Sequence, residues 1–156
     1  MLAKSRFRQK AIIAGFRSGL EEDVCKQLKK AKIKYGYEQI KFKYLIPASS
    51  HFYTPDFVLF NGVVVETKGR WILEDRKKLK LIKEQYPNLD LRIVFNNSRA
   101  KIRKGAKTTY AQICERLKIP FADKEIPADW MTEKLNNKSL KIIEKMGHKN
   151  DNKKNR

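Results

Sequence analysis

The stretch that decides the fold is TPDFVLFNGVVVETK, residues 54–68. Two apolar runs flank Asn61-Gly62, a dipeptide typical of tight hairpin turns, so the sequence predicts two paired strands. A Pro-Asp step opens the first run, and the second run delivers Glu66 and Lys68 two residues apart. Ionisable groups rarely lie at the ends of buried strands without a partner. A metal ion and a phosphate group would supply that partner.

The register of this hairpin determines whether its charged side chains can meet. Glu66 and Lys68 share a strand face and lie roughly 6.6 Å apart. A two-residue turn would place Asp56 opposite Thr67, on the face away from Glu66. A three-residue loop or a bulge would pair Asp56 with Glu66 instead. For a functional site we therefore predict the second register, or an Asp56 that leaves the ladder just after the proline.

The trio Asp56, Glu66 and Lys68 suits metal-assisted phosphate chemistry. Mg²⁺ prefers oxygen ligands and often takes one or two carboxylates, with water and substrate phosphate completing its shell. The lysine could orient or deprotonate an attacking water, or stabilise charge on the phosphate. Burial and a bound metal would lower its pKa and the carboxylates would raise it, and the sequence does not decide between them. The alternative is an ordinary ion-paired hairpin end, because Glu-x-Lys alone is a weak motif.

The chain carries far more positive charge than solubility requires. Of its 156 residues, 36 are Lys or Arg and 17 are Asp or Glu, a net charge of +19. This excess predicts a polyanionic partner, with an RNA, an anionic membrane surface and a merely soluble basic protein as alternatives to DNA. The acid-free segments 1–17 and 99–107 and the basic tail 138–156 fit arms that order on a phosphate backbone.

The cysteines and the hydropathy indicate the cellular compartment in which the protein is expected to work. Cys25 and Cys114 show no metal-ligand spacing and sit among apolar residues in helical patterns, so packed free thiols are expected. Free thiols suit a reducing cytoplasm. No apolar run is long enough to cross a membrane, and the apolar segment 11–16 is too short for a signal peptide.

Apolar periodicity predicts an α/β fold in which helices flank a mixed central sheet. A capping-box pattern at residues 18–21 starts the first helix, which ends near Ala31. Alternation then predicts one long strand over 35–46, halted by Pro47. The remaining predicted elements are strands at 53–60 and 63–68, a helix at 74–85, a strand at 89–95, a helix at 109–117 and an extended piece at 119–121. The predicted order is αβββαβαβ.

One domain is expected over residues 15–131, with Trp130 lying on the surface of its core. A basic flexible arm, residues 1–14, precedes this domain. A basic, disordered tail, residues 132–156, follows it, because no pattern beyond Thr132 predicts packed structure.

Taken together, these residues resemble a known family. Pro55-Asp56, nine intervening residues and then Glu66-Thr67-Lys68 resemble the PD-(D/E)xK nuclease superfamily. Within it, the chain is similar to the endonuclease I family of T-odd podophages, which resolves four-way (Holliday) DNA junctions. The similar segments are GFRSGLE (15–21), IPAS (46–49), YTPDF (53–57), VETKG (65–69), RIVF (92–95) and FADKEIPADW (121–130).

The resemblance implies an active site and a cofactor. In the family a glutamate of the first helix joins the hairpin carboxylates and the lysine, and the matching residues here are Glu21, Asp56, Glu66 and Lys68. It also implies that these carboxylates and the main-chain carbonyl of Thr67 bind Mg²⁺, with Mn²⁺ able to substitute. Without the resemblance, helix capping is the favoured role of Glu21.

The resemblance also implies a restriction-endonuclease-like fold and a strand-exchanged homodimer. The segment near 45–50 would cross between the two chains as an extended bridge, because a proline-containing connector need not turn back. Glu21 would then come from one chain and Asp56, Glu66 and Lys68 from the other. Two such sites would make paired cuts across a junction in the cytoplasm of a bacterial host.

Contacts to DNA are expected from the basic residues around this site. They would bind phosphate and carry no sequence information, so recognition by branch shape is expected. His51 is expected to bond locally in preference to binding phosphate. The predicted contacts are Arg17, Arg70, Arg76, Lys77, Lys78, Arg99, Lys101, Arg103 and Lys104.

Two other functions compete with junction resolution. One is a restriction-like endonuclease or nickase acting on duplex DNA. The other is a basic architectural DNA-binding protein whose hairpin charges are only structural, against which the intact Asp56, Glu66 and Lys68 argue.

Overall fold

A five-stranded mixed sheet and a separate two-stranded hairpin form the framework of the chain. The computed structural model describes residues 15–46 and 48–151, with side chains described as far as residue 147. The sheet order is β1-β4-β5-β6-β7; β1, β4 and β5 are joined by antiparallel pairing, and β5, β6 and β7 run parallel. The strands are β1 (Tyr35–Tyr37), β2 (Phe42–Ile46), β3 (Ser49–Tyr53), β4 (Phe57–Leu59), β5 (Val63–Lys68), β6 (Asp90–Phe95) and β7 (Phe121–Asp123). The predicted α/β class is confirmed.

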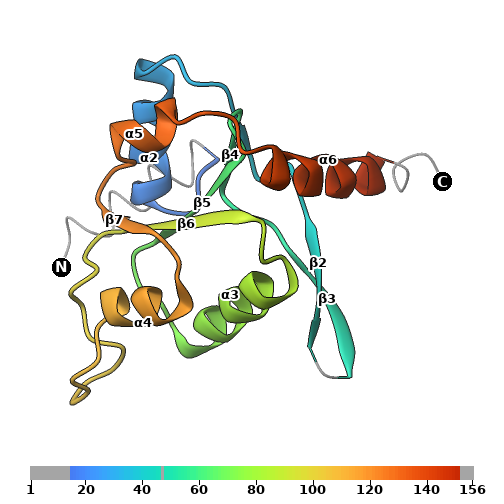
Figure 1. The fold of residues 1–156 in the computed structure, drawn as a ribbon. Helices are drawn as coiled ribbons and strands as arrows, with labels where there is room; N and C mark the ends of the chain where they lie inside the picture. Colours follow the sequence, from blue (N-terminus) through green and yellow to red (C-terminus); the bar gives the residue numbers. More distant parts are fainter. Residues whose placement is uncertain (1–14, 47, 152–156) are drawn as a thin grey trace.

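Helices cover both faces of this sheet, and Figure 1 shows α2 and α5 on one face with α3 and α4 on the other. Their bounds are α2 (Gly19–Lys30), α3 (Leu73–Gln85), α4 (Tyr110–Leu117), α5 (Ala128–Thr132) and α6 (Asn137–Asp151). The Ser18 hydroxyl caps α2 as predicted, by accepting the Glu21 N–H at 3.2 Å. Within the described residues, no helix combines the length and apolar character needed to cross a membrane.

The central strand β5 is buried on both faces, which explains its unbroken valine run. Val63 and Val65 pack into the core beneath α2 and α5, together with Leu28 of α2. Val64 faces the opposite core, with Leu79 of α3. Because side chains alternate along a strand, Glu66 follows Val64 on one face of the sheet and Thr67 follows Val65 on the other.

The predicted long strand over 35–46 is wrong, because the structure divides it into β1 and β2. Glu38 has a φ of 49°, in the left-handed region that no strand residue adopts. After this break the chain leaves the main sheet, and β2 pairs with β3 from Phe42↔Tyr53 to Ile46↔Ser49. The result is five strands where the sequence predicted three before the helix at 74–85.

The predicted strand over 53–60 is also divided. β3 ends at Tyr53 and β4 begins at Phe57, and Pro55 lies between them. Proline has no N–H to donate to a sheet ladder, so it favours a break at this point. The break frees Asp56 from the ladder.

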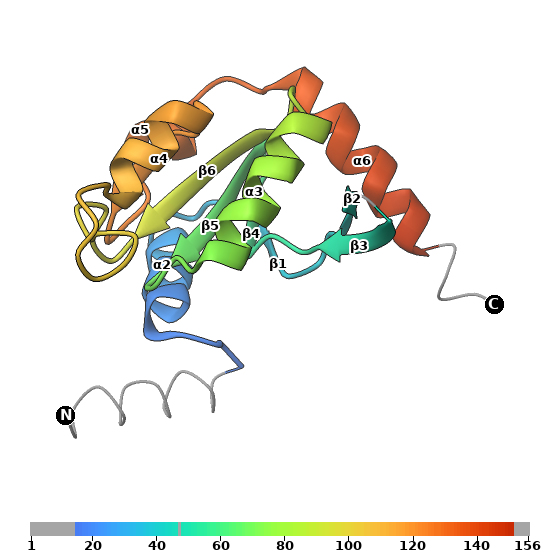
Figure 2. The ribbon, with the colours of Figure 1, turned by 90° about the horizontal axis from the view of Figure 1, so that it is seen from below.

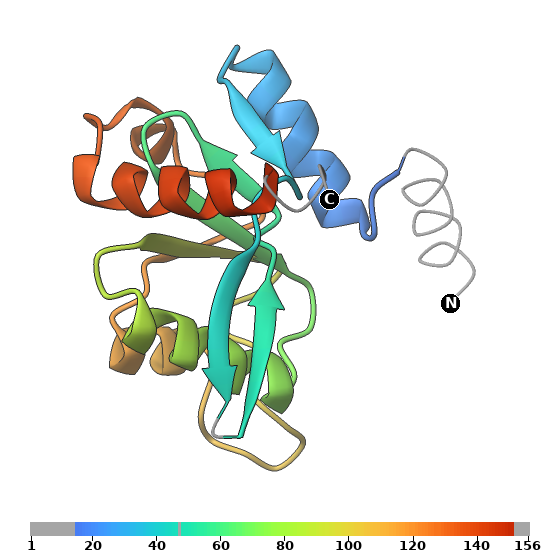
Figure 3. The same cartoon turned by 90° about the vertical axis from the view of Figure 1, so that its right-hand side faces the viewer.

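The hairpin β2–β3 projects from the body of the molecule in Figure 1, and Figure 3 shows its two strands face on. Its turn contains residues 47 and 48, of which Pro47 lies outside the described residues, and Ala48 has a φ of 94°. A positive φ is uncommon for a residue with a Cβ. Within this single chain, therefore, the segment 45–50 turns back and pairs with itself, where an extended bridge was predicted.

The predicted disordered tail is wrong for residues 137–151, which form α6. Ser139, Ile143 and Met146 are buried on one side of this helix. The Ser139 hydroxyl donates to the carbonyl of Gly62 at 2.6 Å and accepts the Asp90 N–H at 3.1 Å. The apolar stripe that α6 buries is short and diluted by lysines, so periodicity did not reveal it. The arm 1–14 and residues 152–156 lie outside the described residues.

A buried cation ties β6 to the segment that precedes α6. The guanidinium of Arg92 binds both carboxylate oxygens of Asp90 at 2.7 and 2.9 Å and also contacts Glu133. It lies 5.1 Å from the ring centroid of Trp130, which was predicted on the surface of the core and is buried within one of its clusters. We call Asp90, Arg92 and Glu133 the Arg92 cluster.

Candidate active site

The observed register brings Asp56 next to Glu66. Phe57 pairs with Val65 and Val58 with Val64, so the next position along the ladder sets Asp56 opposite Glu66. This register results from a three-residue loop at 60–62, in which Gly62 has a φ of 92°. The predicted second register is confirmed, and Asp56 stands just outside the last paired residue.

Asp56 is buried and is held by the neighbouring strand. Its Oδ2 accepts hydrogen bonds from the Thr67 N–H and the Thr67 hydroxyl, both at 2.8 Å. Burial and the nearby charge of Glu66 raise the pKa of Asp56 to about 7, although the Thr67 hydrogen bonds oppose the shift. Among the described residues, the hydrogen bonds to this carboxylate end on Oδ2, which leaves Oδ1 for another ligand.

Glu66 and Lys68 form a close ion pair at the end of β5. Lys68 Nζ lies 2.9 Å from Glu66 Oε1, and the Tyr53 hydroxyl donates to Glu66 Oε2 at 2.7 Å. Burial alone would lower the pKa of Lys68, but the charges of Glu66, Asp75 and Asp56 outweigh it and raise that pKa. The lysine is therefore an ammonium group at neutral pH. Between burial and the carboxylates, the carboxylates prevail in raising this pKa, and a bound cation would act in the opposite direction.

Glu21 lies at the same end of the sheet, on α2. Its Oε2 accepts the Tyr37 hydroxyl at 2.7 Å and the Arg17 N–H at 2.9 Å. Its charge contributes to the raised pKa of Asp56. Within the single chain, Glu21 thus lies near enough to Asp56 for its charge to act on it, and it also serves the helix start by accepting a backbone N–H.

The carboxylates offer the hard oxygen ligands that Mg²⁺ uses, although their oxygens do not converge on a common centre. Among the described residues, no group of three or more His, Cys, Asp and Glu side chains is arranged to hold a metal ion. Mg²⁺ needs only one or two protein carboxylates. Asp56 and Glu66 are buried, and burial together with the charge of Glu66 raises the pKa of Asp56, so a cation would stabilise the ionised pair. These residues fit a divalent cation.

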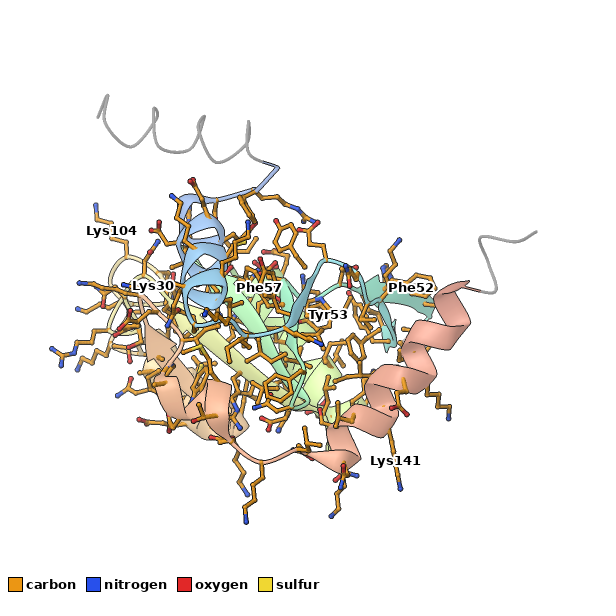
Figure 4. All side chains as sticks on the ribbon, turned by 90° about the horizontal axis from the view of Figure 1, so that it is seen from above. Lys30, Phe52, Tyr53, Phe57, Lys104 and Lys141 are labelled. Atoms are coloured by element: carbon orange, nitrogen blue, oxygen red, sulfur yellow. The ribbon has the colours of Figure 1, made fainter. Side chains whose placement is uncertain are left out.

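Two residues that the sequence did not point to contact this site. The Tyr53 hydroxyl binds Glu66, and Asp75 Oδ2 lies 3.4 Å from Lys68 Nζ. Figure 4 shows Tyr53 where the hairpin meets the sheet, near Phe57. Tyr53 only begins a predicted strand, and an acid in the first turn of a helix is usually explained by the helix dipole. Neither residue therefore carried a distinct signal in the sequence.

The predicted DNA contacts divide into exposed and engaged residues. Arg76 donates to the carbonyl of Trp71, and Lys78 pairs with Asp75, so both are half-buried and have partners within the protein. Arg17 is exposed but pairs with Glu38 at 2.6 Å. The fully exposed members are Arg70, Lys77, Arg99, Lys101, Arg103 and Lys104. Four of them occupy the loop that follows β6.

This basic loop lies at the same edge of the sheet as the candidate site. β6 is parallel to β5, with Phe95 opposite Lys68, so the loop begins where the site ends. Figure 2 shows it beyond the arrowhead of β6, and Figure 4 shows Lys104 extending outward. His51, in contrast, bonds to Ser49 at 2.7 Å and stacks on Tyr44, the local role that was predicted.

The cysteines take no part in the site. Cys25 and Cys114 are both buried free thiols, as predicted. The sulfur of Cys25 lies 2.7 Å from the Tyr35 hydroxyl, within the core beneath α2.

Comparison with known proteins gives a consistent picture. The family described as phage endonuclease I matches residues 2–152. Endonuclease I of Escherichia phage T7 is 57% identical over 121 residues, which cover 78% of this chain and 81% of the relative. Endodeoxyribonuclease 1 of Enterobacteria phage T3 is 53% identical over 118 residues, which cover 76% of this chain and 78% of the relative.

Proposed function

Because the chain belongs to the phage endonuclease I family and is a DNA endonuclease, we propose a more specific activity. The enzyme resolves four-way junctions and other branched DNA by metal-dependent phosphodiester hydrolysis. The observation that carries the proposal is the convergence of Asp56, Glu66 and Lys68 through a three-residue loop. A simple two-residue turn would have separated them. The proposed setting is the cytoplasm of a bacterial host.

Asp56, Glu66, Glu21 and the Thr67 carbonyl are the proposed ligands of Mg²⁺, for which Mn²⁺ should substitute. When bound there, the metal would lower the pKa of a coordinated water and neutralise charge on the scissile phosphate. The electron-rich pair Asp56 and Glu66 supports this assignment, because a cation would relieve the repulsion that raises the pKa of Asp56.

Lys68 is the proposed electrostatic partner of the scissile phosphate. The carboxylates around it raise its pKa, so it is an ammonium group that can donate a hydrogen bond to a phosphate oxygen. A fixed ammonium group stabilises charge that develops on a phosphate oxygen, most effectively where water is excluded. This favours charge stabilisation over the role of general base.

The exposed basic residues support binding to a branched polyanion. Arg99, Lys101, Arg103 and Lys104 surround the site edge with positive charge that phosphates can neutralise. Such contacts hold the substrate without reading bases. Branch shape is therefore the proposed basis of selectivity.

We further propose that the working form is a strand-exchanged homodimer. The β2–β3 turn includes an Ala48 with positive φ, and Leu45 and Ile46 beside it expose 56% and 37% of their surface. Opening this turn would release the unfavourable backbone and allow α2 and β1 to make the same contacts with a second chain. Glu21 would then lie near Asp56 across the dimer, as it lies near it here within one chain.

The proposed activity is tested on a panel of labelled DNAs. Four-way junction, nicked duplex and plain duplex are incubated with Mg²⁺, Mn²⁺ or EDTA. Metal-dependent cleavage of the junction above the other two supports the proposal. Preferred cutting of plain duplex supports a restriction-like enzyme, and tight binding with no cutting in either metal would falsify the enzyme assignment in favour of an architectural protein.

Strand exchange is tested by complementation. Glu21→Ala chains and Lys68→Ala chains are inactive separately, and they are unfolded together and refolded as a mixture. An exchanged heterodimer contains one site with both Glu21 and Lys68 intact, so single-strand nicking returns. A mixture that stays inactive, or a monomer by light scattering at micromolar concentration, contradicts exchange.

A further inference from the structure

We propose that Tyr53, Asp75 and Lys78 are positioning residues that hold Glu66 and Lys68 in their working geometry, an inference that rests on the proposed function of this site. Together the five side chains form a closed circuit of contacts, which we call the support ring. None of the three positioning residues needs to touch the DNA.

The support ring is continuous in the structure. The Tyr53 hydroxyl donates to Glu66 Oε2, and Glu66 Oε1 pairs with Lys68. Lys68 then contacts Asp75 Oδ2 at 3.4 Å, and Asp75 Oδ1 lies 3.3 Å from Lys78 Nζ. Lys78 Nζ lies 5.8 Å from the centroid of the Tyr53 ring, within the range of a cation–π contact, which closes the circuit.

The burial of the support ring separates it from ordinary surface ion pairs. Tyr53 and Glu66 are almost fully buried, and even Asp75 and Lys78 expose only 23% and 29% of their side chains. The exposed pair Lys80–Glu84 on the same helix exposes more than half of each side chain. Charges that are shielded from water are held more firmly and interact more strongly.

Three separate elements supply the support ring, so its members are fixed by the fold. Tyr53 ends β3, Glu66 and Lys68 lie on β5, and Asp75 and Lys78 occupy the first turns of α3. Asp75 is therefore near the positive end of the helix dipole, which stabilises its ionised form. The N-cap residue of α3, Ile72, provides no side-chain cap, yet Asp75 is engaged with the two lysines.

Each contact has a clear positional effect. Tyr53 holds one oxygen of Glu66, which fixes the rotamer of this proposed ligand in the way that outer hydrogen bonds commonly orient metal-binding carboxylates. Asp75 gives Lys68 a second acidic partner. The ammonium group would therefore keep one ion pair if Glu66 bound a metal ion instead. Lys78 in turn holds Asp75 and covers the Tyr53 ring.

The first test compares single-turnover cleavage by paired variants of α3. Asp75→Asn and Lys78→Gln should each lower the rate on a four-way junction about 10- to 100-fold, the effect typical of lost outer contacts. The matched controls Glu84→Gln and Lys80→Gln remove the exposed pair of the same helix and should cut at the wild-type rate. Junction affinity in EDTA and the melting temperature should stay near wild type for Asp75→Asn.

The second test uses metal binding and needs no cleavage. Tyr53→Phe removes only the hydroxyl on Glu66, so Mn²⁺ affinity measured by calorimetry should fall about tenfold. The control Tyr86→Phe removes a hydroxyl that bonds to the carbonyl of Lys43 in the hairpin, and it should leave Mn²⁺ affinity unchanged. Because the ring acts as a unit, Tyr53→Phe combined with Asp75→Asn should slow cleavage by less than the product of the single effects.

Three outcomes overturn the inference. These are wild-type cleavage and Mn²⁺ binding by the Asp75 and Tyr53 variants, losses no larger than those of the controls, and losses that follow junction affinity or melting temperature. A wild-type protein that cuts no DNA instead overturns the proposed function, and the Mn²⁺ measurement still decides whether Tyr53 positions Glu66.

Discussion

Two clusters of buried charge lie at opposite ends of the parallel strands β5 and β6, and they differ in how well their charges are balanced. In the Arg92 cluster, burial would raise the pKa of Asp90, but the hydrogen bonds and charge of Arg92 prevail and lower it. At the candidate active site, burial and the charge of Glu66 raise the pKa of Asp56 to about 7. One acid is stabilised as an anion, and the other is destabilised.

The difference distinguishes a structural cluster from the candidate active site. A guanidinium that binds both oxygens of a carboxylate satisfies both partners within the protein. Asp56 instead accepts hydrogen bonds from the neutral Thr67 groups, while Lys68 pairs with Glu66 and Asp75, so the buried charge of Asp56 is less well compensated than that of Asp90. Perturbed acids of this kind gather at functional sites, because binding or catalysis later supplies the missing partner.

The largest expected effect is the loss of cleavage when the cation of the candidate active site is removed. Lys68→Met should slow single-turnover junction cleavage by about 10³-fold, since it removes the ammonium that stabilises charge on the phosphate. Junction affinity measured by gel shift in EDTA should remain near wild type. An affinity that collapses together with cleavage would contradict a specifically catalytic role for Lys68.

The next effect is a loss of stability when the cation of the Arg92 cluster is removed. Arg92→Met leaves Asp90 and Glu133 without their cation and should lower the free energy of unfolding by about 3 kcal/mol, as measured in urea. The exposed control Arg103→Met should change it by less than about 0.5 kcal/mol. Arg92→Met should still cut junctions at the wild-type rate where it is folded, and a selective loss of cleavage would place Arg92 in the site.

The raised pKa of Asp56 should make the stability of the protein depend on pH. The pKa of Asp56 is about 7 in the folded protein and 3.8 ordinarily, so between these values the folded state holds a proton that the unfolded state has lost. In EDTA, stability should therefore fall as pH rises from about 4 to 7, by roughly 4 kcal/mol at most from this group.

The matched variant for this pH dependence is Asp56→Asn, whose amide oxygen can still accept the Thr67 hydrogen bonds. It should lack this part of the slope and be more stable than the wild type at pH 8 in EDTA. Parallel curves for the two proteins would show that Asp56 is not a destabilised acid.

The smallest effect tests the outer member of the Arg92 cluster. Glu133 exposes 41% of its side chain, so solvent screens its ion pair with Arg92. Glu133→Gln should cost about 1 kcal/mol in urea unfolding, well below the cost of Arg92→Met. Equal costs for the two variants would mean that the cluster responds as one unit.

Much of this site could be predicted because its signal is local. The Pro-Asp step, the Asn-Gly turn and Glu66-x-Lys68 lie within fifteen consecutive residues, and the need for the carboxylates to meet selects the correct register. Glu21 was reached only through family resemblance, because its spacing equally predicts a helix cap. The helices α2, α3 and α4 have clear caps or apolar faces and match their predictions.

The errors arose where distant contacts decide the structure. The alternation over 35–46 is real, but it cannot reveal the left-handed Glu38 that transfers the chain from one sheet to another. α6 gains its order from packing and from the contacts of Ser139 with Gly62 and Asp90, which no local pattern shows. Tyr53 and Asp75 likewise become partners of Glu66 and Lys68 only when the sheet and α3 come together.

The loop at 60–62 has a consequence for the order of events during protein synthesis. Its Asn61 side chain donates to the carbonyl of Trp130, and its Gly62 carbonyl accepts the hydroxyl of Ser139, 77 residues further along the chain. A Cβ at position 62 would come within 3.0 Å of the Asn136 carbonyl, so the turn and the C-terminal segment fit each other closely. The loop that aligns Asp56 with Glu66 therefore receives these restraints only after the ribosome has made the chain as far as Ser139. A nascent chain that ends before Ser139 lacks them, which delays the assembly of the candidate site until the α6 segment has been made.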